Sequence, residues 1–297
     1  MAKIFSIIIP VYNDSEDLKL VLDAINRQDF PAENVETFVV DNGSSDDSIE
    51  VAKGFSFVNV LLEHEYLNSP YSCRNRGIEK ANGDIIVLLD ASCKPVGNWL
   101  NAAHDCYNKT DAEIIGGDVK FDFKGKVTAG KVYDSITNIK MQESIEGKGV
   151  AKTANLFIRK EIFEKVGVFP EGLRSGGDVR WTAKASKQGY KLQFCKNAIV
   201  YKTARSILEL LKKQWRVGSH QPIIKNALGE RNNLLRKMVR VFVPINPIAI
   251  NSMIKKNDLS IGFINIILVS SIGQLMKLVM LFSNLYGLLK LRINKYL

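Results

Sequence analysis

Uninterrupted apolar runs alternate with spaced apolar stripes along the first 120 residues of the chain. The short apolar runs predict strands that are covered on both faces, as in a parallel sheet. The stripes, in which apolar residues recur three or four positions apart, predict amphipathic helices. Strands are expected at 3–9, 37–40, 58–62, 84–89 and 113–115, and helices at 14–28, 45–53, 72–81 and 99–107. Strands that alternate with helices across short connections predict a doubly wound, mostly parallel sheet.

The pattern changes towards the C-terminal end. Residues 259–289 contain one charged residue, Lys277, and their small or polar residues recur at helical spacing in a narrow stripe. A helix with this pattern has a wide apolar face. Residues 202–256 before it carry twelve Lys and Arg against two acidic residues. Pro244 and Pro247 would break any helix between the two regions.

A basic segment followed by a wide apolar face is typical of a helix that lies in the interface of an anionic membrane. Two other interpretations stay open from the sequence. The helix could span the membrane, since the stretch approaches the ~20 residues that a span requires. It could also be buried in a core or in a homodimer, because hydropathy does not separate these cases. We expect a peripheral or monotopic protein on the cytoplasmic face of the cell membrane.

Charge is distributed unevenly along the chain. The first 120 residues carry 10 Lys and Arg against 20 Asp and Glu, whereas the remaining residues carry 31 against 11. The acidic first part argues against a nucleic-acid-binding protein, and the basic second part requires an anionic partner such as ligand phosphates or a membrane surface. The four cysteines have no Cys-x-x-Cys spacing, which suits a reducing compartment. We expect no secretory signal peptide, because the first residues lead directly into a strand.

Carboxylates follow two of the predicted strands. Asp90 follows the apolar run 85–89, and Asp41 follows the strand at 37–40. A carboxylate at the C-terminal end of a parallel strand lies where open α/β sheets bind ligands, and it can hold a ribose hydroxyl or a metal that bridges phosphates. Asp41 can accept hydrogen bonds from the edge of a base. An alternative is that the residues after Asp41 only form a turn, because Asn, Gly and Ser are common in turns that bind no ligand.

The first strand-to-helix turn excludes two common nucleotide-binding loops. It reads Pro10-Val11-Tyr12-Asn13, without the glycines of a dinucleotide-binding fold or of a Walker phosphate loop. Phosphates would therefore have to be held by a cation or by basic side chains.

Taken in order, these motifs resemble the signature of family 2 glycosyltransferases, which are inverting enzymes of the GT-A fold that use nucleotide-diphosphate sugars. Each motif is weak alone, but their order and spacing are specific, and the resemblance fades after about residue 220. The matching segments are Ile9-Pro10-Val11-Tyr12-Asn13, Val40-Asp41-Asn42-Gly43-Ser44-Ser45-Asp46, Arg74-Asn75-Arg76-Gly77-Ile78, Leu89-Asp90-Ala91-Ser92, Ala154-Asn155-Leu156-Phe157-Ile158-Arg159, Gly167-Val168-Phe169 and Gly176-Gly177-Asp178-Val179-Arg180-Trp181.

The resemblance implies a role for each matching position. Arg74 would lie under the diphosphate, and Asp178 would be the general base. Ala154, Asn155 and Trp181 would lie near the sugar and the acceptor. The nucleotide pocket would be lined by Pro10, Tyr12, Asn13, Asp41, Gly43, Ser44, Asp90 and Ala91.

Inverting transfer needs a base that takes the proton of the acceptor hydroxyl as this hydroxyl attacks the anomeric carbon. Asp178 begins the amphipathic helix expected at 178–187, where the helix dipole favours the ionised carboxylate. An alternative is that Asp178 only caps this helix.

Two positions depart from the family pattern. Ser92 replaces the second Asp of the Asp-x-Asp motif, and a hydroxyl is a poor ligand for a hard cation. Mg²⁺ or Mn²⁺ would then bind more weakly, through Asp90, the diphosphate and waters. Gly177 replaces the acidic neighbour of the base. Alternatively, basic residues take over from the metal at the diphosphate, with Lys94, Arg180, Lys202, Arg216 and His220 as the candidates.

The expected molecule is an α/β protein with a GT-A domain over residues 1–220 and a basic, amphipathic helical region over 221–297. Residues 1–120 would form the nucleotide-binding half and 121–220 the acceptor and catalytic half. The expected activity is transfer of a sugar, with UDP as the expected nucleotide, to a hydroxyl of a glycan or lipid-linked acceptor, as in cell-surface polysaccharide biosynthesis. The two departures leave open a weak or inactive relative that only binds nucleotide sugars.

Overall fold

The computed structural model describes residues 4–227, 238–239 and 241–293, and it groups the chain into two compact units. Unit 1 comprises Met1–Asp122 and Ile139–Thr203, and unit 2 comprises Phe123–Asn138 and Ala204–Leu297. The sequence placed a boundary near residue 220, as the end of the catalytic domain. The functional extent of that domain stays a prediction.

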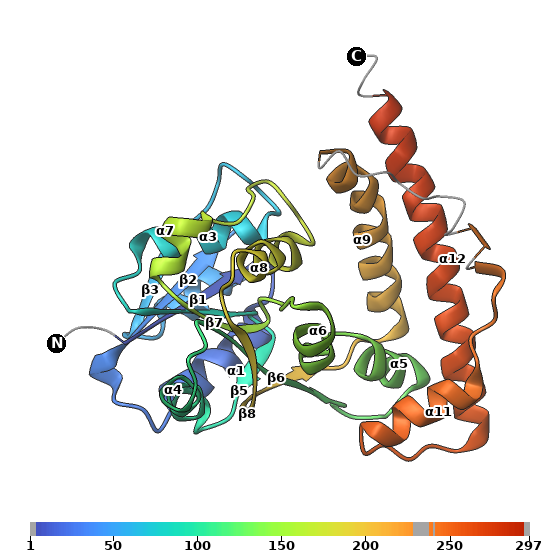
Figure 1. Ribbon diagram of the computed structural model, residues 1–297, viewed down its shortest axis with the longest axis horizontal. Coiled ribbons are helices and arrows are strands. Elements are labelled where there is room, and N and C mark those ends of the chain that lie inside the picture. The colour runs from blue at the N-terminus through green and yellow to red at the C-terminus, as the bar shows by residue number, and fades with distance from the viewer. Residues whose placement is uncertain (1–3, 228–237, 240, 294–297) are drawn as a thin grey trace. The chain divides into compact units, whose positions relative to one another are not determined.

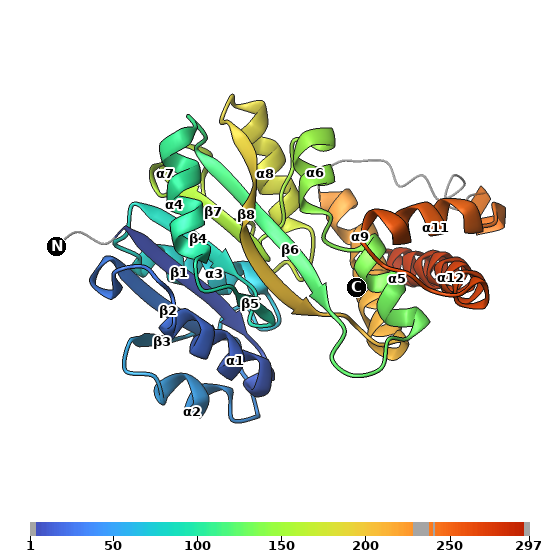
Figure 2. The same ribbon diagram turned by 90° about the horizontal axis from the view of Figure 1, so that it is seen from below.

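Unit 1 is built on one eight-stranded sheet with the order β3-β2-β1-β4-β7-β6-β8-β5 (Figure 2). Strands β1 to β4 pair in parallel, as do β6 and β8, whereas β7 and β5 run antiparallel to their neighbours. The expected α/β class is therefore confirmed. The strands are β1 (Phe5–Val11), β2 (Val35–Asp41), β3 (Val58–Leu62), β4 (Ile85–Leu89), β5 (Cys93–Pro95), β6 (Ile114–Asp122), β7 (Asn155–Arg159) and β8 (Leu192–Thr203).

The helices of unit 1 are α1 (Ser15–Asn26), a short 3₁₀ helix (Ala32–Asn34), α2 (Ser48–Lys53), α3 (Pro70–Lys80), α4 (Trp99–Lys109), α6 (Met141–Lys148), α7 (Glu161–Val166) and α8 (Gly177–Lys187). Five of them, α1, α2, α3, α4 and α8, match those that the sequence predicted, with shifts of a few residues at their ends, whereas the 3₁₀ helix, α6 and α7 were not predicted.

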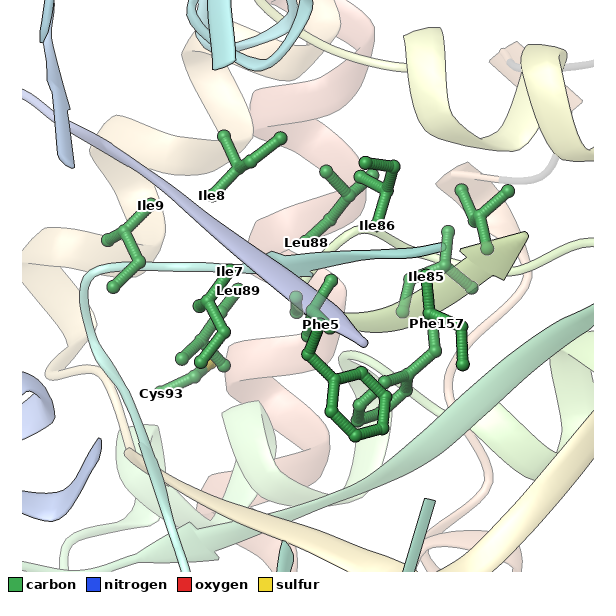
Figure 3. Close-up of a cluster of buried hydrophobic side chains, with 14 of the residues drawn as sticks. Phe5, Ile7, Ile8, Ile9, Ile85, Ile86, Leu88, Leu89, Cys93 and Phe157 are labelled. Carbon is green, nitrogen blue, oxygen red and sulfur yellow. The ribbon is translucent and has the colours of Figure 1, made fainter. Parts of the chain in front are cut away.

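The core of unit 1 is centred on β1 and β4, whose apolar runs are buried along their whole length. Phe5 and Ile7 on β1 lie with Leu88 on β4 and Phe157 on β7 in one cluster (Figure 3). Both faces of these central strands are covered, which explains why their sequences are continuously apolar. The parallel pairing of β1 with β2 and β4 brings the C-terminal ends of these strands to one edge of the sheet.

Unit 2 consists of α5 (Ala129–Thr137), α9 (Ile207–Ala227), α11 (Pro247–Lys256) and α12 (Phe263–Ile293) in the described part of the chain (Figure 1). Its small core joins segments that are far apart in sequence. The core residues are Val132 and Ile136 on α5, Ile250 and Ile254 on α11, and Ile266 and Val269 on α12. Four of the basic residues counted before α12, Arg231, Arg236, Lys237 and Arg240, lie outside the described residues.

Helices α9 and α12 lie side by side (Figure 1) and approach each other through small residues. A Cβ atom on Gly218 of α9 would lie 1.8 Å from Oγ of Ser283, and one on Gly287 of α12 would lie 2.2 Å from the carbonyl oxygen of Ser219. Ser283 and Asn284 are fully buried. Glycine is therefore required at both contact positions.

The opposite face of α12 is apolar and exposed. Phe263 is 73% exposed and Ile264 is 74% exposed, and Phe282 and Leu289 are also largely exposed. The buried part of the predicted stripe, Ser270, Gly273, Asn284 and Gly287, faces the rest of unit 2 together with the apolar residues Ile266, Val269 and Met276. Gly262, Asn265 and Lys290 of the predicted stripe are exposed. The helix over Phe263–Arg292 is long and apolar enough to cross a membrane by length and composition alone, and its most apolar 18-residue window has a mean hydropathy of 1.9.

Candidate active site

The turns after β1 and β2 are joined by hydrogen bonds. The backbone N–H of Asn13 donates to Oγ of Ser44 at 3.0 Å, and the N–H of Ser45 donates to Oδ1 of Asn13 at 2.7 Å. Asn13 and Gly43 adopt φ angles of 49° and 83°, in the left-handed region that asparagine and glycine tolerate best. The exposed ring of Tyr12 stands beside this junction. The structure therefore brings Pro10, Tyr12, Asn13, Gly43 and Ser44 together at one edge of the sheet.

Asp41 lies buried below these turns. Its Oδ2 accepts hydrogen bonds from the N–H groups of Gly43 at 2.9 Å and Ser44 at 3.0 Å. Within the described residues, the buried Oδ1 has no hydrogen-bond partner. A buried carboxylate oxygen without a donor is costly, so this oxygen is suited to accept a hydrogen bond from a ligand.

Asp90 lies between two basic side chains at the end of β4. Nη2 of Arg74, on α3, is 2.8 Å from Oδ1 of Asp90, and Nζ of Lys202, on β8, is 3.7 Å from Oδ2. Lys202 also donates a hydrogen bond to the hydroxyl of Ser92. The neighbouring Ala91 is buried. The sequence named Arg74, Asp90, Ser92 and Lys202 separately, and the fold assembles them into one cluster.

The residues around Asp90 do not fit the divalent cation that was expected there. Both oxygens of Asp90 face basic groups, and the Ser92 hydroxyl is occupied by Lys202. In the part of the chain that the structure describes, no three His, Cys, Asp or Glu side chains lie close enough to hold a metal ion. The expectation that Asp90 and Ser92 bind Mg²⁺ or Mn²⁺ stays a prediction, and in this structure an ammonium group lies against both side chains.

Asp178 is half-buried in the first turn of α8, and its Oδ1 accepts a hydrogen bond from the hydroxyl of Tyr71 at 2.9 Å. The backbone N–H of Val179 donates to the same oxygen. Desolvation by burial, together with the nearby charge of Asp178, raises the pKa of the Tyr71 phenol, which therefore stays protonated as a donor. The hydrogen bonds that the Asp178 side chain makes with described residues both go to Oδ1, which leaves Oδ2 for another partner.

Tyr71 links the two halves of the site. The guanidinium of Arg74 lies 5.5 Å from the centre of the Tyr71 ring, three residues further along the same helix face. Polar and ring contacts thus run from Asp178 through Tyr71 and Arg74 to Asp90. Tyr71 was not among the site residues predicted from the sequence. Its position at the start of a helix, three residues before a basic residue, was the available signal.

Lys152 is a second residue that the sequence analysis did not identify. Burial lowers the pKa of its ammonium group, and the charge of Asp178 opposes that shift. Its Nζ donates to Oγ of Ser144 at 3.1 Å. Lys152 is half-buried and lies within the electrostatic influence of the candidate base.

The structure places Asn155 and Trp181 in the core and not at a ligand-binding surface. Asn155 is fully buried, accepts from the indole of Trp99 and donates to two backbone carbonyls. Trp181 stacks on Phe163 and donates to the carbonyl of Gly167. Their hydrogen-bonding groups are used internally, so their positions do not support the expected contacts with sugar or acceptor. Ala154, which directly precedes Asn155, is also buried.

Arg216 and His220 belong to α9 in unit 2. Nδ1 of His220 lies 2.8 Å from the carbonyl oxygen of Arg216 and 3.3 Å from Oγ of Ser219. A role for either residue at the diphosphate stays a prediction.

A doubly wound sheet with carboxylates at the C-terminal ends of its strands, and a further carboxylate at the start of α8, is the arrangement expected of a nucleotide-sugar glycosyltransferase of the GT-A fold. The model of the family described as Glycosyl transferase family 2 matches residues 6–167. The chain belongs to glycosyl transferase family 2 and is a glycosyltransferase.

Known proteins resemble the chain in sequence and in fold. Glycosyltransferase AglE of Haloferax volcanii is 44% identical over 220 residues, which are 73% of this chain and 72% of that protein. The dolichyl N-acetyl-alpha-D-glucosaminyl phosphate 3-beta-D-2,3-diacetamido-2,3-dideoxy-beta-D-glucuronosyltransferase of Methanococcus voltae is 25% identical over 70% of each chain. The mannosyltransferase PcManGT of Pyrobaculum calidifontis, solved with GDP-Man and Mn²⁺, has a TM-score of 0.62 and 16% identity. That match covers 96% of this chain and 88% of PcManGT, and it shows the shared fold.

Proposed function

We propose that this glycosyltransferase moves a sugar from a nucleoside-diphosphate donor, with inversion, to a hydroxyl of a lipid-linked glycan acceptor, and that Asp178 is the general base. The observation that carries the proposal is the connected set of contacts from Asp178 through Tyr71 and Arg74 to Asp90. These contacts connect the candidate general base to the edge of the sheet where the strands β1 and β2 end. At that edge, Oδ1 of Asp41 is left to accept a hydrogen bond from the nucleobase of the donor.

In the proposed reaction, the acceptor hydroxyl donates its hydrogen bond to Oδ2 of Asp178. Its oxygen attacks the anomeric carbon from the side opposite the diphosphate while the proton passes to Asp178. The bond from the anomeric carbon to the phosphate oxygen breaks, and the nucleoside diphosphate leaves with the electron pair. The Tyr71 hydroxyl holds the other carboxylate oxygen and so keeps Oδ2 directed at the acceptor.

The lipid-linked acceptor is proposed on two observations. The Methanococcus voltae relative is named for a dolichyl phosphate-linked substrate. In addition, α12 exposes a wide apolar face, which is suited to contact with a membrane in which such an acceptor resides. We therefore place the enzyme at the cytoplasmic face of the membrane.

The variant Asp178→Asn tests the base. It should lower transfer by ~10²–10⁴-fold and leave nucleotide affinity unchanged, because it removes the proton acceptor with little change in shape. Transfer is measured with a panel of nucleotide sugars on extracted lipid-linked glycans, and nucleotide affinity by calorimetry. Asp105→Asn on the exposed side of α4 is the matched control. Turnover of Asp178→Asn within a few-fold of the wild type would remove Asp178 from this role, and failure of the wild type to consume any donor would favour the inactive nucleotide-sugar-binding relative.

A further inference from the structure

Lys202 is a buried lysine at the ligand-binding edge of unit 1. It is 4% exposed, and Nζ lies 3.7 Å from Oδ2 of Asp90 and 3.8 Å from Sγ of Cys93. It also donates to the hydroxyl of Ser92. A buried ammonium group is stable only where anionic and polar groups surround it. The side chain is therefore a fixed part of the site and not a solvated surface group.

Strand pairing determines where this ammonium group lies. Strand β8 runs between β6 and β5, and Lys202 is in register with Phe121 on β6 and with Cys93 on β5. Asp90 and Ser92 belong to the connection between β4 and β5, directly before Cys93. The same register therefore brings Nζ to both of its oxygen partners, and the backbone of three strands fixes its position.

The cluster carries more positive than negative charge. One carboxylate, Asp90, faces the guanidinium of Arg74 and the ammonium of Lys202. A divalent cation beside an aspartate would supply the same two positive charges, and phosphate oxygens would complete its ligands. With Ser92 in place of a second acid, the two basic groups are available to the oxygens of a diphosphate.

Asp14 shows that the charge of Lys202 extends over the site. Burial raises the pKa of Asp14 to about 6, Asp17, Asp46 and Asp90 add to this shift, and the charge of Lys202 opposes it. Asp14 precedes α1, directly after the turn proposed for the nucleotide. The charge of Lys202 therefore favours the ionised form of Asp14, against the effect of burial.

We propose that Lys202, together with Arg74, receives the diphosphate of the donor in the place that a divalent cation would occupy, so that donor binding and transfer need no metal ion. The inference rests on the function proposed above. As the anomeric carbon–oxygen bond breaks, its electron pair stays on the diphosphate, and the ammonium and guanidinium groups stabilise that charge without giving up a proton. The proton of the acceptor hydroxyl goes to Asp178.

Calorimetric titration of the full chain with UDP, GDP and UMP tests the inference. Whichever of UDP and GDP binds should have the same affinity, within about threefold, in EDTA and in Mn²⁺. Lys202→Met should weaken binding of that diphosphate by ~10-fold or more and leave UMP unchanged, because UMP lacks the second phosphate. Lys202→Arg should restore part of the affinity. Lys120→Met, which removes an exposed lysine from β6, is the matched control, and circular dichroism shows whether each variant is folded.

The reciprocal variant Ser92→Asp/Lys202→Met should create a metal site. Electron paramagnetic resonance should show that it binds Mn²⁺ more tightly than the wild type, and its UDP or GDP binding should become sensitive to EDTA. Loss of wild-type nucleoside-diphosphate binding in EDTA would overturn the inference, as would a folded Lys202→Met that binds as the wild type does. If neither UDP nor GDP binds with or without metal, the donor assignment fails and both proposals fall. If binding behaves as expected and Asp178→Asn retains transfer, the base assignment alone is wrong.

Discussion

The side chain of Tyr71 restricts which residue can occupy position 177, directly before the candidate base Asp178. A Cβ atom on Gly177 would lie 2.9 Å from Cδ2 of the Tyr71 ring, a distance at which something has to move. From the sequence, Gly177 was notable only because it replaces the acidic residue of the family motif. The structure gives the physical reason, since the ring that donates to Asp178 fills the space that a side chain at 177 would need.

Gly177→Ala should therefore displace Tyr71. We expect a loss of about 1–3 kcal/mol in the free energy of unfolding, as for other overpacked sites. We also expect a fall in kcat with little change in KM, because Tyr71 would no longer direct Asp178. Gly147→Ala on α6 is the control, since nothing lies within 4 Å of its added Cβ, and it should stabilise the helix by about 0.5–1 kcal/mol. Unchanged kcat in Gly177→Ala would show that Tyr71 does not position the base.

The site residues that the sequence could identify are those marked by local signals. Asp41 and Asp90 follow apolar strands, and Asp178 begins a helix. Lys202 was named as one of several basic residues, but its contact with Ser92 depends on the pairing of β5 with β8, which no local pattern records. Asn155 matches a family motif, yet its amide donates to backbone carbonyls in the core. The sequence could not predict this, because a motif match does not distinguish a residue that packs in the core from one that contacts a ligand.

At the level of elements, α12 resembles a membrane helix in how it packs. Its buried glycine Gly287 packs against α9, and Lys277 donates to the carbonyl of Val243, in the chain before α11, at 2.7 Å. Close packing through small residues is common between helices in membranes. The sequence predicted the helix and its stripe from their spacing. It could not indicate α9 as the partner, since that contact joins segments far apart in the chain.

Gly218→Val should separate α9 from α12, because the added Cβ would overlap with Oγ of Ser283. We expect unit 2 to lose about 1–3 kcal/mol of stability, measured as faster hydrogen exchange in α9 and α12 with little change in unit 1. Gly262→Ala, whose Cβ would meet nothing within 4 Å, should exchange as the wild type does. Equal protection of α12 in Gly218→Val and the wild type would contradict this packing.

For the whole molecule, the exposed apolar face of α12 predicts attachment to membranes. The full chain should float with vesicles that contain anionic lipid, and it should do so less at high salt, which screens the basic residues. Phe263→Gln/Ile264→Gln should reduce the bound fraction several-fold. Leu20→Gln, which changes an exposed apolar residue on α1, should not. Release from the membrane by alkaline carbonate would identify an interfacial helix. A stable dimer that does not bind vesicles would show instead that the apolar face is a protein interface.

The segment Phe123–Asn138 interrupts unit 1 between β6 and β7, yet its helix α5 completes the core of unit 2. On the ribosome, α5 is made well before α11 and α12, the helices whose isoleucines cover Val132 and Ile136. Unit 1 can therefore fold during synthesis while α5 still has an uncovered apolar face. A nascent chain in this state depends on a chaperone or on rapid completion to avoid aggregation. For the same reason, a shortened protein without the C-terminal helices should also have residues 123–138 replaced by a short polar turn.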